Sequence, residues 1–117
     1  YPGDPASPVH AVAARQMRDF GGMVSFRIRG GESAARTVCA STRLFTLGES
    51  LGGVESLIEL PAVMTHASVA ESELAVPTEL VRLSVGIEDA ADLVADITSA
   101  LDAAREQPPR HAAADGA

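Results

Sequence analysis

The chain has 117 residues, a length that predicts one domain with a real hydrophobic core. Its net charge of −7 argues against nucleic-acid binding, which needs clustered cations, and no apolar run approaches the roughly 18 residues of a transmembrane helix. The single cysteine, Cys39, excludes an internal disulfide and favours the cytosol. All nine cationic side chains are arginine, so the chain has no lysine to form a Schiff base with an aldehyde cofactor.

The first predicted element is a helix between Ser7–Pro8 and Gly21–Gly22. Serine caps helices and proline suits the first helical position, whereas paired glycines end a helix. A stripe at helical spacing should face inward, and apart from one glutamine it is apolar: Val9, Val12, Ala13, Gln16, Met17 and Phe20.

Four strands are predicted, at residues 23–29, 44–47, 56–60 and 80–85. The first and last alternate apolar and polar residues, which indicates antiparallel strands with one wet face. We expect that wet face to carry Arg27, Arg29, Arg82 and Ser84.

Two further helices are predicted, at residues 32–41 and after Gly86, with one helical turn near residues 71–74. Their inward side chains should be Ala34, Ala35, Val38 and Cys39 in the first and Ala90, Val94, Ile97 and Leu101 in the second. The element order predicts an α+β two-layer sandwich, in which three helices cover one face of a small antiparallel four-stranded sheet. Residues 1–104 would form this domain, and residues 105–117, which have no period, a disordered tail.

The loop between the second and third strands carries Glu49, Ser50, Gly52 and Gly53. A scaffold can present small polar groups to a ligand in this way, but a tight glycine connection with incidental polar residues is equally compatible with the pattern. The loop lacks the GK[ST] pattern and the strand-to-helix context of a phosphate-binding loop.

Arg82 is the sharpest single signal, because a guanidinium in the middle of an apolar strand must be hydrated or paired. It could form an ion pair with an acid of this domain or face water. Alternatively, it could bind a carboxylate ligand through its bidentate fork, for which arginine geometry is suited.

The stretch at residues 64–68 adds Thr65 and His66. A lone histidine is most often structural or a surface group. A hydrolase pair of Ser50 and His66 is disfavoured, because no nucleophile elbow surrounds the serine. The histidines show no metal-ligand spacing and one cysteine supplies no thiolate cluster, so no metal site is expected.

Several stretches together resemble the C-terminal part of the cystathionine γ-synthase and γ-lyase family, pyridoxal-phosphate enzymes of cysteine and methionine metabolism with the aspartate-aminotransferase type of fold. The resemblance runs from residue 1 to about residue 104. It is carried by residues 20–26 (FGGMVSF), 45–47 (FTL), 49–58 (ESLGGVESLI), 64–68 (MTHAS) and 80–89 (LVRLSVGIED).

The resemblance implies a substrate-binding role for four residues. Arg82 would bind the α-carboxylate of the amino-acid substrate, and the backbone of Ser50 would help to place substrate and cofactor lysine. Glu49 would lie near the distal end of the substrate, where reaction choice is set, and Thr65 would line the same pocket. The cofactor lysine and the other pyridoxal-phosphate-binding residues would belong to a larger upstream domain, so we expect no catalytic or cofactor-binding residue on this chain.

The resemblance also implies partners. The substrate would be cystathionine, or an activated homoserine with cysteine, and the full-length enzyme would be a cytoplasmic homotetramer. Because the chain does not begin with methionine, we expect a processed or excised piece that is inactive alone. The alternative is a stand-alone amino-acid-binding or interaction module.

Overall fold

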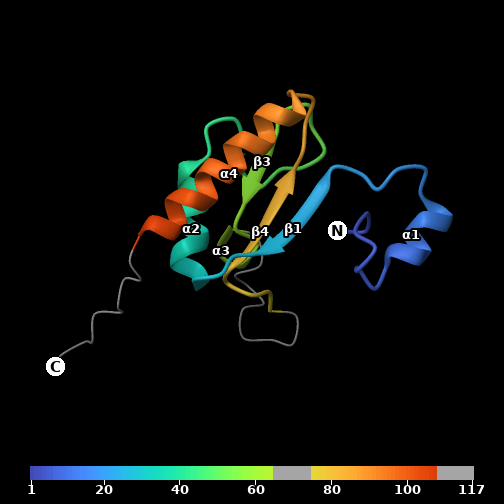
Figure 1. The fold of residues 1–117 in the computed structure, drawn as a ribbon, viewed down its shortest axis with the longest axis horizontal. Helices are drawn as coiled ribbons and strands as arrows, with labels where there is room; N and C mark the ends of the chain where they lie inside the picture. Colours follow the sequence, from blue (N-terminus) through green and yellow to red (C-terminus); the bar gives the residue numbers. More distant parts are fainter. Residues whose placement is uncertain (65–74, 108–117) are drawn as a thin grey trace.

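The computed structural model describes residues 1–64 and 75–107 (Figure 1). One four-stranded sheet has the strand order β1-β4-β3-β2. In chain order the elements are α1 (His10–Gln16), β1 (Met23–Arg27), α2 (Gly31–Ser41), β2 (Thr46–Leu47), β3 (Leu57–Glu59), α3 (Pro61–Met64), β4 (Leu80–Ser84) and α4 (Ala90–Glu106).

The sheet is mixed, so the prediction of an antiparallel sheet was wrong for one pair. Strand β4 runs antiparallel to both β1 and β3, whereas β2 and β3 are parallel. Residues 48–56 do not close a hairpin between β2 and β3. They carry the chain back to the end where β2 began, so that both strands run in the same direction.

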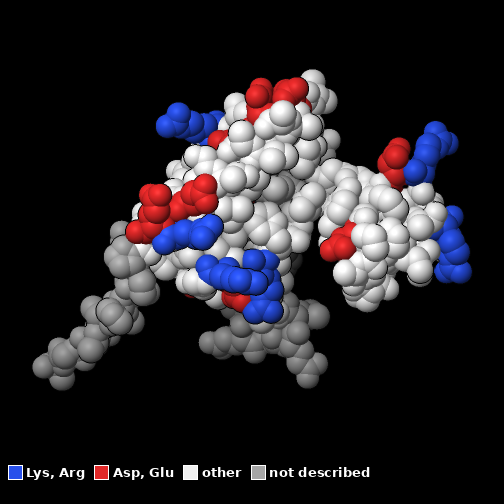
Figure 2. Space-filling model, viewed as in Figure 1, with Lys and Arg blue, Asp and Glu red and all other residues white. Residues whose placement is uncertain are grey.

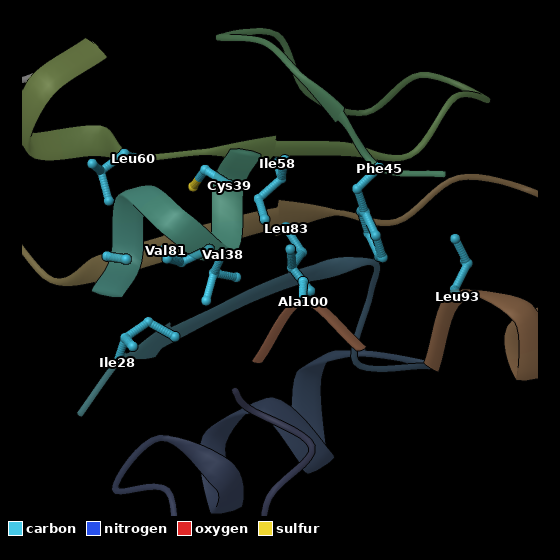
Figure 3. Close-up of a cluster of buried hydrophobic side chains, with 11 residues drawn as sticks. Ile28, Val38, Cys39, Phe45, Ile58, Leu60, Val81, Leu83, Leu93 and Ala100 are labelled. Atoms are coloured by element: carbon cyan, nitrogen blue, oxygen red, sulfur yellow. The ribbon is translucent and has the colours of Figure 1, made fainter. Parts of the chain in front are cut away.

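The core lies between the sheet and two helices that pack side by side on one of its faces, α2 and α4 (Figures 1 and 3). Strands β3 and β4 supply Ile58, Val81 and Leu83, which are at most 6% exposed. Helix α2 buries Val38 and Cys39 beside them, as the spacing predicted. The two-layer α+β architecture is therefore confirmed.

The prediction that three helices cover one face of the sheet was wrong for α1. This helix lies apart from the others, beyond β1 (Figure 1), and is shorter than predicted. Of its supposed inward stripe only Ala13 is buried, whereas Val9 is 54% and Val12 46% exposed. Helices α2 and α4 therefore cover the sheet without α1.

The predicted core-facing stripe of helix α4 is half correct: Ile97 and Leu101 pack against the core, whereas Ala90 and Val94 are exposed. Leu93 and Ala100 are buried, whereas Val94 is 63% exposed. The core face of α4 is therefore rotated toward Leu93 and Ala100, which share it with Ile97 and Leu101. The helix also continues through Glu106, so the tail was predicted to begin too early.

Asp96 on α4 fastens the segment before β2. Its carboxylate accepts hydrogen bonds from the backbone N–H groups of Arg43, Leu44 and Phe45 at 2.8–3.1 Å. Desolvation by itself raises the pKa of Asp96, but these donors outweigh it and lower the pKa below its ordinary value.

Some expectations fall on residues 65–74 and 108–117, which lie outside the described residues, among them the helical turn near residues 71–74. Within residues 1–64 and 75–107, no helix has the length and apolar character needed to cross a membrane.

Candidate functional site

Arg82 lies at the middle of β4, on the face of the sheet opposite α2 and α4. Its neighbours Val81 and Leu83 point into the core, so the alternation of the strand turns Arg82 to the other face. Ser25 of β1 and Glu59 of β3 are its partners in register on either side. The predicted position of Arg82 in the middle of a strand is confirmed, and β1 and β3 flank that strand.

The guanidinium of Arg82 forms an ion pair with Glu59 through Nη2 and Oε2. The arginine side chain is 19% exposed and the glutamate 1%. Pairing with an acid of the same domain was one of the alternatives for Arg82, and the ion pair is present. A buried carboxylate needs such a partner, because desolvation penalises an isolated charge strongly.

The same nitrogen also reaches the loop between β2 and β3. Nη2 of Arg82 donates to the backbone carbonyl oxygens of Glu49 at 3.1 Å and Ser50 at 3.5 Å. The structure therefore brings three predicted site residues together, although Glu49 and Ser50 contribute backbone atoms to the contact and are exposed. Thr65, the fourth predicted site residue, and His66 lie outside the described residues.

Two hydrogen bonds and one close backbone approach hold the loop against the end of β4. The N–H of Gly52 donates to Oγ of Ser84 at 2.8 Å, and the N–H of Ile87 donates to the carbonyl of Val54 at 2.9 Å. A Cβ on Gly86 would overlap the carbonyl group of Val54. Only glycine allows this close approach of two backbone segments.

A second contact fastens the C-terminal end of the loop to the residues before α4. The N–H and Oγ of Ser56 donate to the carboxylate of Glu88 at 2.8 and 2.6 Å, and Ser56 Oγ accepts from the N–H of Gly86 at 2.8 Å. The hydrogen bond from the Ser56 hydroxyl, with that from its N–H, lowers the pKa of Glu88. The loop therefore has fixed points on both sides of Val54.

Sequence reasoning missed Glu59, Ser56 and Glu88 as parts of this arrangement. Glu59 gave a signal, since it is the one acid in the apolar run at residues 57–60. A carboxylate at that place in a central strand requires a partner in the same way as Arg82 does. Ser56 and Glu88 gave no comparable signal, because serine before a strand and glutamate before a helix are common.

The guanidinium at this site suits a carboxylate, which accepts hydrogen bonds from its donors. Nε of Arg82 is buried without an acceptor among the residues that the structure describes. The same residues contain no group of three or more histidine, cysteine or acidic side chains able to hold a metal ion. Nor does the chain have the lysine that would attach an aldehyde cofactor.

A hollow of about 960 Å³ opens elsewhere, among β1, α2 and α4, and includes Arg29, Thr37 and Leu101 in its lining. Arg82, Glu49 and Ser50 are not part of it. On the face drawn in Figure 2, described acidic and basic side chains lie close together over the end of α4, where Arg105 lies 3.8 Å from Asp102. This mixture of charges gives that region no strong field of one sign.

Comparisons with known proteins agree on one family. The family model described as Cys/Met metabolism PLP-dependent enzyme matches residues 1–102. Cystathionine gamma-synthase of Mycobacterium tuberculosis (strain H37Rv) is 66% identical over 101 residues, which cover 86% of this chain and 26% of that protein. Cystathionine gamma-lyase of Dictyostelium discoideum is 55% identical over 105 residues, which cover 87% of this chain and 27% of that protein.

Among solved structures, that of metB from Corynebacterium glutamicum superposes with a TM-score of 0.84 at 60% sequence identity. The match covers 87% of this chain and 26% of the other. This chain therefore spans about a quarter of the length of these relatives. The family match extends over nearly all of the described fold, from α1 into α4, and shows that the chain belongs to the Cys/Met metabolism PLP-dependent enzyme family.

Proposed function

We propose that this chain is the C-terminal substrate-binding part of a pyridoxal-phosphate-dependent enzyme of the cystathionine γ-synthase or γ-lyase type. Such an enzyme would replace or eliminate the γ-substituent of an amino-acid substrate. The relatives named above, at 66% and 55% identity, support this assignment. The observation that carries it is the guanidinium of Arg82 beside the loop that holds Glu49 and Ser50.

In this proposal Arg82 binds the α-carboxylate of the substrate and so fixes the direction of the bond to be broken at Cα. The backbone of Ser50 helps to place the substrate, Glu49 lies toward its distal end and Thr65 lines the pocket. Pyridoxal phosphate, when bound, supplies the electron sink for the reaction. The residues described here bind and orient the substrate, and the lysine for the cofactor would come from other parts of the full-length polypeptide.

The proposal extends to assembly and location. The upstream cofactor-binding domain would complete the site that this chain leaves open, and the full-length enzyme would be a cytoplasmic homotetramer. Sedimentation of the full-length protein tests the assembly, because a monomer would contradict it.

The experiment that tests the function is an assay of the full-length enzyme with two substrate sets. One contains cystathionine, and the other contains an activated homoserine ester with cysteine. We expect turnover of at least one set. A full-length protein that binds pyridoxal phosphate and turns over neither set would contradict the proposal.

The chain by itself should be inactive, because it has no lysine for the cofactor. We expect the 117-residue chain with added pyridoxal phosphate to form no product from either substrate set. Circular dichroism checks that the chain is folded in the assay. Product formation by the folded chain alone would favour the alternative of an independent module.

A further inference from the structure

Glu59 occupies the most buried charged position that the structure describes. It is 1% exposed, and it lies on β3 directly opposite Arg82 in the register of β3 and β4. Its carboxylate meets Nη2 of Arg82. Replacing such a buried pair by apolar residues is often neutral for stability, so a stability argument alone does not account for a glutamate at this position.

The contacts of Arg82 with these groups all meet one nitrogen of its guanidinium. Glu59, the carbonyl of Glu49 and the carbonyl of Ser50 all meet Nη2, so three groups from two elements hold the same nitrogen. Nε is buried and has no acceptor among the described residues. A long flexible side chain is thereby held by one corner of its planar fork, and its direction is fixed.

We propose that Glu59 is a positioning residue for Arg82. By holding Nη2, the Glu59 carboxylate orients the guanidinium so that its other donors face the carboxylate of an amino-acid substrate. This inference rests on the proposed function, in which Arg82 binds that carboxylate. A preorganised arginine loses less freedom on binding than an arginine that must first be ordered.

The sheet offers a matched pair for comparison. Arg27 on β1 is paired with Glu79, and its Nε donates to Oε1 of Glu79 at 2.8 Å. The side chain of Arg27 is 66% exposed, and among the described residues no loop carbonyl accepts a hydrogen bond from it. The Arg27–Glu79 pair therefore has the same chemistry as the Arg82–Glu59 pair without the burial or the loop contacts.

The test measures steady-state kinetics of the full-length enzyme with a substrate that has a free α-carboxylate. The variants are Glu59→Gln, Arg82→Ala and the double variant, with Glu79→Gln as the control. We expect Glu59→Gln to raise KM roughly tenfold and to change kcat less than about threefold, because it loosens an arginine that binds substrate. In the Arg82→Ala background, Glu59→Gln should change KM less than about twofold, and Glu79→Gln should leave KM unchanged.

The two hypotheses fail in different ways. If Arg82→Ala raises KM and Glu59→Gln does not, the positioning role is overturned and the proposed function stands. The positioning role is also overturned if Glu59→Gln raises KM equally in both backgrounds, because Glu59 would then act independently of Arg82. If Arg82→Ala leaves KM unchanged, the proposed function itself fails.

Glu59→Gln leaves Arg82 without a buried counter-charge and could prevent folding. In that case Glu59→Asp provides the test, because it keeps the charge and withdraws the carboxylate from Nη2. A rise in KM of about threefold with unchanged thermal stability supports the positioning role. An unchanged KM overturns it.

Discussion

On β4, alternate residues serve two faces of the sheet that differ in chemistry. Val81 and Leu83 face α2 and α4 and are packed among aliphatic side chains (Figure 3). Arg82 faces the opposite side and meets the buried carboxylate of Glu59 and the loop carbonyls. The helical face has little to specify beyond shape and volume, whereas the polar face requires particular partners at particular atoms. The apolar core thus lies on one side of β4, and the substrate-binding residue of the proposed function lies on the other.

Removing a side chain from the helical face should have the largest effect on stability. Ile58 is 0% exposed, so Ile58→Ala leaves a cavity and should lower the free energy of unfolding by about 3 kcal/mol. Urea unfolding of the 117-residue chain measures this. Val94→Ala is the control, because Val94 is 63% exposed and its loss should change the free energy by less than about 0.5 kcal/mol. Equal effects of the two variants would contradict the assigned core.

The close approach of Gly86 to the loop should be nearly as sensitive to substitution as the core. Gly86→Ala forces the backbone away from Val54 and should lower the free energy of unfolding by about 2 kcal/mol. Gly53→Ala, in the loop that Gly86 approaches, is the matched control, since a Cβ at Gly53 meets nothing within 4 Å. If Gly86→Ala is as mild as Gly53→Ala, the two backbone segments do not approach as closely as described.

A smaller effect should appear as a dependence of stability on pH. Hydrogen bonds from Ser56 lower the pKa of Glu88 from its ordinary value of 4.5. A carboxyl group whose pKa is lower in the folded state stabilises the fold above its unfolded pKa, and this contribution disappears as the pH falls through the folded pKa. The stability difference between the wild-type chain and Glu88→Gln should therefore be largest at neutral pH and should shrink in acid.

Urea unfolding across the pH range measures this difference. The comparison with Glu88→Gln isolates Glu88 from Glu79, whose hydrogen bond to Arg27 also lowers its pKa. A stability difference that is constant with pH would show that Glu88 does not act through its charge.

The strongly periodic parts of the fold could be predicted from the sequence. The alternation of residues 80–85 predicted β4 and predicted that Arg82 lies on the face away from the core. Helical spacing predicted that Val38 and Cys39 are buried. In both cases one side of the element is much more apolar than the other, so period and burial agree.

Features that depend on contacts distant in sequence could not be predicted. The composition of residues 48–56 indicates a loop but not the direction in which the chain returns, so the parallel pairing of β2 and β3 was missed. The apolar stripe of α1 correctly predicted a helix but wrongly predicted that this helix covers the sheet. Helical spacing does not say whether a face of the sheet is already covered. Glu59 was missed although its partner Arg82 was identified, because the pairing of two residues follows from strand register rather than from composition.

The most direct test of the account is the effect of Arg82→Ala on the kinetics of the full-length enzyme. We predict a higher KM and a loss in kcat/KM that corresponds to roughly 2 kcal/mol, the scale of a lost charge-assisted hydrogen bond. Arg27→Ala removes the exposed arginine on the neighbouring strand and should leave kcat/KM unchanged. Unchanged kinetics in Arg82→Ala, or an equal loss in both variants, would contradict the claim that the polar face of the sheet binds the substrate carboxylate.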